Sequence, residues 1–295
     1  MLIKEEIANW FQDLQNNICT ALEQGDGKGK FLTDTWERPG GGGGRSRVIT
    51  DGNVIEKGGV NFSAVHGDTP QKILSALQLK QADFYATGVS IVLHPINPWV
   101  PIIHMNVRYF EMSNGVYWFG GGIDLTPHYI NQDDARFFHA SLKEVCDSFD
   151  NTYYPKFKQW ADDYFYIKHR RETRGIGGIF FDRLTSERKS SIFEFVQAVG
   201  QAFAPIYTHL MSQHKDKPYD DSEKQWQYLR RGRYVEFNLV WDKGTKFGLD
   251  TDGRTESILM SLPPFASWHY NYAPPEGSPE AETIAQLTKN KNWLS

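Results

Sequence analysis

Hydrophobic and polar residues alternate with a period of two through much of the segment 88–128. Alternate residues of a β-strand share one face of the sheet. In residues 102–110 one face therefore carries His104, Asn106 and Arg108, and the other face carries apolar side chains. The pattern predicts a strand whose apolar face belongs to the core and whose polar face belongs to a functional site.

The flanking runs extend this prediction to a small antiparallel sheet. Residues 88–94 alternate in the same way and place Ser90 and His94 on one side. The sequence Ser-Asn-Gly at 113–115 is typical of a hairpin turn, so residues 116–119 are expected to return beside the central strand.

A run of three glycines at 120–122 ends this stretch and leads to Asp124. Glycine lets the backbone bend sharply or approach a ligand closely. Each polar residue of the stretch, taken singly, is more often structural than functional. Together, a serine, two histidines, an asparagine and an arginine of matching parity favour a site.

Helical spacing of apolar residues marks most of the remaining chain. An amphipathic helix is expected at about residues 1–22. Further helices are expected at about 71–80, 131–148, 155–170, 191–212 and 222–230. His139 lies beside the apolar stripe of the second of these, and His169 lies near the end of the third.

Further strands are expected at 47–50, 53–57, 174–182 and 234–241. The glycines at 40–44 precede two arginines, which leaves open a flexible connector or an anion-binding lid. His66 is assigned to a turn because a glycine follows it. Residues 258–262 fit either a buried strand or a helical segment.

The order of these elements predicts an α+β fold. We expect a single domain over residues 1–295, with a large, mostly antiparallel β-sheet flanked by α-helices on both faces. The proline-rich tail, about 263–295, is expected to wrap the surface.

Charge and cysteine content exclude several classes of protein. Lys and Arg total 32 against 36 Asp and Glu, and the formal net charge of -4 argues against a general nucleic-acid or anionic-membrane binder. Two cysteines are too few for a disulfide framework or a cysteine-bound iron–sulfur cluster. No apolar run reaches membrane-spanning length, so we expect a cytoplasmic protein.

Four long stretches resemble the oxygen-dependent coproporphyrinogen III oxidases of heme biosynthesis. They are LHPINPWVPIIHMNVRYFEM, WFGGGIDLTPHY, YFYIKHRRETRGIGGIFFD and YVEFNLVWDKGTKFGL, the last followed by GRTESILMSLPP. The resemblance implies conversion of the ring A and B propionates of coproporphyrinogen III into vinyl groups, with dioxygen as co-substrate and without an organic cofactor.

Such a site must hold carboxylates and move a proton. Guanidinium groups suit carboxylates, which makes Arg108 and Arg254 candidates for the propionates. Asp124 is the candidate catalytic carboxylate, and His104 is the candidate proton donor or acceptor. The full set of expected substrate-binding residues is Ser90, Asn106, Val107 through its backbone, Arg108, Asp252, Gly253 and Arg254.

A metal site is a separate question. His94, His104, His139 and His169 match histidines proposed as metal ligands in bacterial members of the family, whereas other members are thought to work without metal. Their spacing matches no local metal-binding motif.

Asp252 departs from the family pattern, because many members carry glycine at this position before Gly-Arg. An extra carboxylate near anionic propionates is unfavourable, so Asp252 is expected to face away from the substrate or to pair with an arginine. The resemblance also implies a homodimer whose interface includes residues 234–269. Two alternatives remain at this point: a non-catalytic tetrapyrrole carrier, and a metal-dependent oxygenase acting on another substrate.

Overall fold

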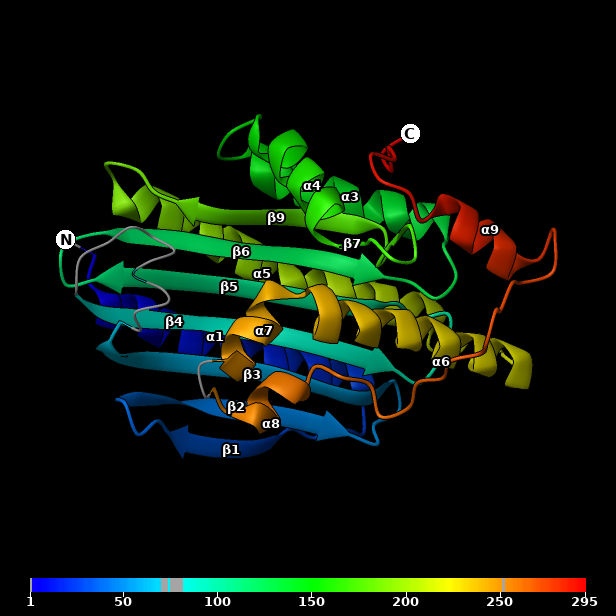
Figure 1. The fold of residues 1–295 in the computed structure, drawn as a ribbon, viewed down its shortest axis with the longest axis horizontal. Coiled ribbons are helices and arrows are strands. Elements are labelled where there is room, and N and C mark those ends of the chain that lie inside the picture. Colours follow the sequence, from blue (N-terminus) through cyan, green and yellow to red (C-terminus); the bar gives the residue numbers. More distant parts are fainter. Residues whose placement is uncertain (1, 70–73, 75–81, 251–252) are drawn as a thin grey trace.

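The architecture is that of a large antiparallel sheet covered by helices, seen in a computed structural model that describes residues 2–69, 74, 82–250 and 253–295 (Figure 1). Seven strands form the sheet in the order β1-β2-β3-β4-β5-β6-β9, and β7 and β8 form a separate small pair. The strands are β1 (Leu32–Glu37), β2 (Gly42–Thr50), β3 (Ile55–Asp68), β4 (Asp83–Pro95), β5 (Ile102–Met112), β6 (Tyr117–Thr126), β7 (Tyr166–Ile167), β8 (Glu172–Thr173) and β9 (Gly177–Leu184).

The predicted alternation in β5 is confirmed. The apolar residues of 103–109 are buried, whereas His104, Asn106 and Arg108 are partly exposed. β5 lies antiparallel between β4 and β6, so His104 faces Val92 on one side and Asp124 on the other. A two-faced strand in the middle of the sheet thus separates a core face from a polar face.

Helices cover both faces of the sheet, which confirms the predicted α+β class. They are α1 (Lys4–Asp26), α3 (Gln132–Asp147), α4 (Tyr153–Tyr164), α5 (Lys189–His214), α6 (Asp221–Glu236), α7 (Lys243–Asp250), α8 (Thr255–Leu259) and α9 (Pro279–Gln286). α1 and α5 pack on the apolar face, whereas α6, α7 and α8 lie on the polar face (Figure 1).

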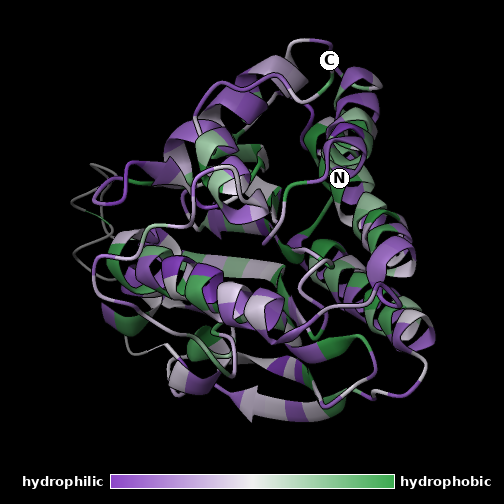
Figure 2. Ribbon diagram, turned by 90° about the vertical axis from the view of Figure 1, so that its right-hand side faces the viewer, coloured by the Kyte–Doolittle hydropathy of each residue, from purple (hydrophilic) through white to green (hydrophobic). Residues whose placement is uncertain are grey.

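Amphipathic helices supply the core between α1, α5 and the sheet. The inward stripe of α1 includes Ile7, Phe11 and Ile18, each at most 1% exposed. Burying such apolar side chains is the main source of folding free energy. Figure 2 shows the same pattern as alternating hydrophilic and hydrophobic bands along the helices. The tail is fixed to this body through Trp293, which is buried in the same core.

The predicted strand at 234–241 is wrong. Its first residues continue α6 to Glu236, and residues Phe237–Trp241 form a π-helical turn, η1, closed by a hydrogen bond from Asp242 N to Phe237 O (2.9 Å). Alternation there coincides with helical spacing: Tyr234 and Phe237, three apart, are both buried. Residues 258–262 likewise begin in a short helix, α8, and most are only partly buried.

The predicted helix at 155–170 begins earlier and ends at Tyr164, where the chain enters β7. The helix predicted at 71–80 lies almost entirely outside the described residues.

The glycine run at 40–44 forms neither a connector nor a lid. It makes the β1–β2 turn and the start of β2, where a side chain at Gly42 would come within 2.2 Å of Ala64 O. Arg45 faces α1 and hydrogen-bonds Gln15 Oε1 at 2.7 Å. His66 lies in β3 opposite Tyr85, not in a turn.

Candidate active site

A row of polar side chains crosses the polar face of the sheet. The strand register places Ser46, Asn61, Ser90 and Asn106 side by side on β2, β3, β4 and β5. Neighbouring strands are about 4.8 Å apart, so the row from Ser46 to Asn106 spans roughly 14 Å. Ser90 thus lies in the middle of the row, half-buried.

His104 and Asp124 meet one step along from this row. His104 Nδ1 donates to Asp124 Oδ1 at 2.8 Å, because a carboxylate only accepts. Asp124 is 1% exposed, whereas the His104 side chain is 23% exposed. The Asp124 carboxylate is therefore shielded from solvent, and the His104 imidazole bonded to it reaches the open side of the sheet.

Arg174 completes this cluster. Its Nη2 donates to both oxygens of Asp124, at 2.8 and 2.7 Å. Its guanidinium carbon lies 4.3 Å from the Phe165 ring centre and 4.6 Å from that of Phe237, which keeps water away from the ion pair.

Burial and the neighbouring charges together set the pKa values of Asp124 and Arg174. Burial alone would raise the pKa of Asp124, but the Arg174 charge and the His104 hydrogen bond hold it below its ordinary value. Burial also opposes the charge of Arg174, and Asp124 outweighs that effect, so the pKa of Arg174 is raised. Asp124 and Arg174 are thus a buried ion pair.

Sequence patterns alone missed Arg174 as a site residue. The residues around it form a glycine-rich approach to β9, and the family-like stretch 164–182 was the only signal that included it. β9 pairs with β6 so that Gly178 lies opposite Asp124, and this pairing brings Arg174 to the carboxylate.

Arg108 stands at one end of the polar row. Its Nη1 donates to Asn106 Oδ1 at 2.7 Å, and its Nη2 donates to Asp182 Oδ1 at 2.8 Å. The Arg108 side chain is 37% exposed. Arg108 can therefore reach a bound carboxylate.

Arg254 stands at the other end. It donates to Ser257 Oγ at 3.1 Å and pairs with Asp34. Gly253 precedes it and donates to Gly248 O at 2.8 Å. Asp252 lies outside the described residues.

A hollow of about 290 Å³ opens beside Arg254. Lys57 lines it and donates to Leu262 O at 2.8 Å. Two cationic side chains thus face this part of the polar surface.

Val107 is expected to contact the substrate through its backbone, not through its side chain. Its side chain is fully buried in the core, and its backbone lies between Val89 and Gly121 in the sheet. The structure therefore brings together Ser90, Asn106, His104 and Arg108, and gives the Val107 side chain a packing position.

The four histidines expected as metal ligands do not converge. His139 Nδ1 lies 2.9 Å from Tyr154 Oη, and Nε2 lies 3.0 Å from Ile176 O. Burial lowers the pKa of His139 to about 3. His169 binds Glu236 through Nε2 and accepts from Trp241 through Nδ1. His94 Nε2 contacts Ser261 O at 2.8 Å.

All four histidines thus use at least one ring nitrogen on a protein partner, His104 through its contact with Asp124. Within the described part of the chain, no group of three or more His, Cys, Asp or Glu residues is arranged to hold a metal ion. The described residues therefore do not fit a four-histidine metal centre.

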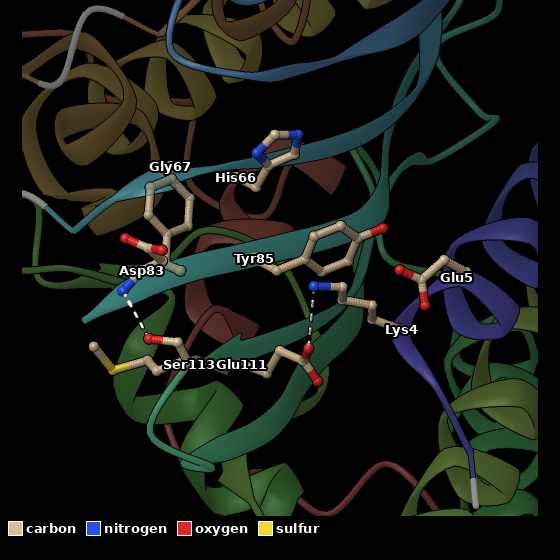
Figure 3. Close-up of a pocket in the computed structure, with 10 residues that line it drawn as sticks. Lys4, Glu5, His66, Gly67, Asp83, Tyr85, Glu111 and Ser113 are labelled. Atoms are coloured by element: carbon tan, nitrogen blue, oxygen red, sulfur yellow. Dashed lines mark hydrogen bonds and ion pairs between the residues drawn. The ribbon is translucent and has the colours of Figure 1, made fainter.

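A second hollow, of about 500 Å³, lies at the far end of the strands (Figure 3). Lys4, His66, Tyr85 and Glu111 are among its lining residues. Glu111 is five residues from Asn106 along β5, about 17 Å at the rise of an antiparallel strand, and this odd spacing places it on the opposite face of the sheet. This hollow is therefore separate from the polar row.

Among the described residues, no helix is both long enough and apolar enough to cross a membrane.

The fold and this cluster define an α+β enzyme whose site combines a buried Asp–Arg pair, a partly exposed histidine and two arginines at the ends of the polar row. A family model described as coproporphyrinogen III oxidase matches residues 6–293. The chain is 48% identical, over 96% of its length and 89% of the relative's, to an oxygen-dependent coproporphyrinogen-III oxidase of Prochlorococcus marinus (strain NATL1A). The chain belongs to the coproporphyrinogen III oxidase family.

Proposed function

We propose that this protein converts coproporphyrinogen III into protoporphyrinogen IX in heme biosynthesis, with dioxygen as the oxidant. In each of two steps a propionate loses a hydrogen with its electron pair to dioxygen. The bond to the carboxyl group breaks, its electrons form the vinyl double bond, and carbon dioxide leaves. With one added proton, the reduced oxygen becomes hydrogen peroxide.

His104 is the residue that handles this proton. It is the partly exposed member of the His104–Asp124–Arg174 cluster, and Asp124 fixes its ring through Nδ1. The buried carboxylate also stabilises a positive imidazolium. His104 Nε2 is then the atom that exchanges a proton with the substrate or with reduced oxygen.

Arginines at both ends of the polar row orient the substrate. Arg108 and Arg254 each present guanidinium N–H groups to carboxylates, and Ser90 and Asn106 add hydrogen bonds between them. The observation that carries the proposal is a partly exposed histidine, backed by a buried Asp–Arg pair, on the same sheet face as two arginines that lie at opposite ends of the polar row.

The test is an incubation of purified protein with coproporphyrinogen III, with and without oxygen and with and without a strong chelator. We expect oxygen-dependent protoporphyrinogen IX. Tight substrate binding without product would instead favour a tetrapyrrole carrier. Loss of product on chelation, with recovery on adding metal, would restore the histidines as ligands.

The protein is also proposed to act as a homodimer through residues 234–269. Several large apolar side chains of this segment are exposed: Leu239, Val240, Leu249, Phe265 and Trp268. Exposed large apolar side chains of this kind are typical of a protein interface. Residues 234–241, 243–250 and 255–259 of the segment are helical, so a dimer formed through them would bury helix faces rather than extend a sheet.

We expect Leu239→Glu combined with Val240→Glu to give a monomer. Both side chains are 44% exposed, so the charges would enter the interface without disturbing the core. Light scattering after size-exclusion chromatography measures the mass. Leu32→Glu, at a side chain 74% exposed on β1, is the control and should leave the dimer intact. A monomeric wild type at micromolar concentration would refute the dimer.

A further inference from the structure

Both arginines at the ends of the polar row already hold an aspartate. Arg108 pairs with Asp182 of β9 at 2.8 Å, and Arg254 pairs with Asp34 of β1. The two aspartate side chains are 30% and 55% exposed. Each pair therefore lies at the surface of the site, open to exchange.

The Arg108–Asp182 pair is built into the sheet. Gly120 lies opposite Arg108 in the β5–β6 register. A side chain at Gly120 would come within 2.6 Å of Asp182 Oδ1 and 2.9 Å of Arg108 Nε. The absence of a side chain there lets the pair lie across β6.

Asp182 uses the guanidinium edge that a propionate would need. Carboxylates bind this edge through the same N–H groups, so Asp182 and a propionate compete for Arg108 Nη2. The Asn106 contact occupies Nη1 and keeps the guanidinium in place while Nη2 changes partner.

We propose that Asp182 and Asp34 are specificity-determining residues: internal carboxylates that occupy Arg108 and Arg254 in the empty site and are displaced by substrate propionates. This inference rests on the proposed function. Before substrate binds, the two aspartates neutralise the charges of the two arginines. The site then favours ligands that bring a carboxylate to each end of the row.

The exchange also runs in reverse after reaction. A propionate that becomes a vinyl group has lost its carboxylate and no longer holds an arginine. The neighbouring aspartate then returns to that arginine and opposes rebinding of the decarboxylated side chain. Exposed pairs of this type are weak, which allows exchange in both directions.

The test measures binding of coproporphyrin III, an unreactive ligand with four propionates, by quenching of protein fluorescence. We expect Asp182→Asn and Asp34→Asn each to tighten binding about fivefold, as expected for freeing a surface ion pair. The double variant should combine both effects, because the two sites lie far apart. Asp182→Glu keeps a competing carboxylate and should bind more like wild type.

Loss of negative charge alone is controlled by Asp133→Asn. Asp133 is 89% exposed and pairs with Arg136 on α3, outside the polar row, and its replacement should change the affinity less than twofold. Unchanged or weaker binding of coproporphyrin III by Asp182→Asn and Asp34→Asn would overturn the inference, since the aspartates would then only support the arginines. Equal tightening by Asp133→Asn would overturn it as well.

Measuring turnover as well as binding distinguishes failure of this inference from failure of the proposed function. If wild type makes no protoporphyrinogen IX but the asparagine variants tighten coproporphyrin III binding, the reaction is refuted and the exchange stands. If wild type turns over and the variants do not tighten binding, only the exchange is refuted. In active variants, a lower KM is the expected signature.

Discussion

Asp124→Asn is expected to lower kcat by a factor of about 10² to 10⁴, the usual contribution of a positioned acid–base group. The amide keeps the shape of the carboxylate but loses its negative charge. It also replaces one of the two oxygens that accept hydrogen bonds from His104 and Arg174. The imidazole then loses its fixed orientation and the partner that stabilises its charged form. Steady-state turnover of coproporphyrinogen III measures the effect.

The same substitution leaves Arg174 buried without its counter-charge. Removing one partner of a buried ion pair typically costs about 3–5 kcal/mol of unfolding free energy, so urea unfolding must accompany the kinetics. Asp162→Asn is the matched control, because Asp162 is 4% exposed and pairs with Lys158 outside the site. It should lose stability but keep kcat. A kcat for Asp124→Asn within threefold of wild type would rule out the proposed role.

Asp26→Ala is expected to give the largest loss of stability outside the site, about 4 kcal/mol, because buried unpaired N–H groups each cost about 1–3 kcal/mol. Asp26 is 3% exposed. Its carboxylate accepts from the backbone N–H groups of Gly29, Asn53, Val54 and Ile55 at 2.6–2.9 Å. It thereby joins the end of α1 to the turn between β2 and β3.

The free energy of unfolding that Asp26 contributes should fall at low pH. Burial raises the pKa of Asp26, but the backbone N–H donors outweigh burial and lower it below the ordinary value. The unfolded chain therefore binds the proton more readily, and the contribution is full above the ordinary pKa of about 3.9. It is lost as pH falls through the lower, folded pKa.

Urea unfolding at several pH values measures both effects. The difference in unfolding free energy between wild type and Asp26→Ala should be constant near neutral pH and should shrink below about pH 4. Asp51→Asn, an exposed change in the same turn, should lie within about 0.5 kcal/mol of wild type. A difference below about 1 kcal/mol for Asp26→Ala would show that water satisfies the freed donors.

Misread segments show where local pattern is insufficient. Residues 234–241 alternate like a strand, yet Tyr234 and Phe237 also satisfy helical spacing. α6 begins at a capping box formed by Asp220 and Glu223, and the helix runs on until a π-turn ends it. A short apolar run fits both periods, and packing against the sheet decides between them.

Local sequence patterns were sufficient to predict the alternating strands β4 and β5, the first residues of β6, the polar face with His104, Asn106 and Arg108, and the family. These features follow from period-two alternation and from long motifs, both of which are local. Only the tertiary structure decided that β9 pairs with β6. That pairing joins residues more than 50 positions apart and brings Arg174 to Asp124 and Asp182 to Arg108. Sequence spacing carries no signal for such contacts, because strand order in a sheet is fixed by the packing of the whole chain.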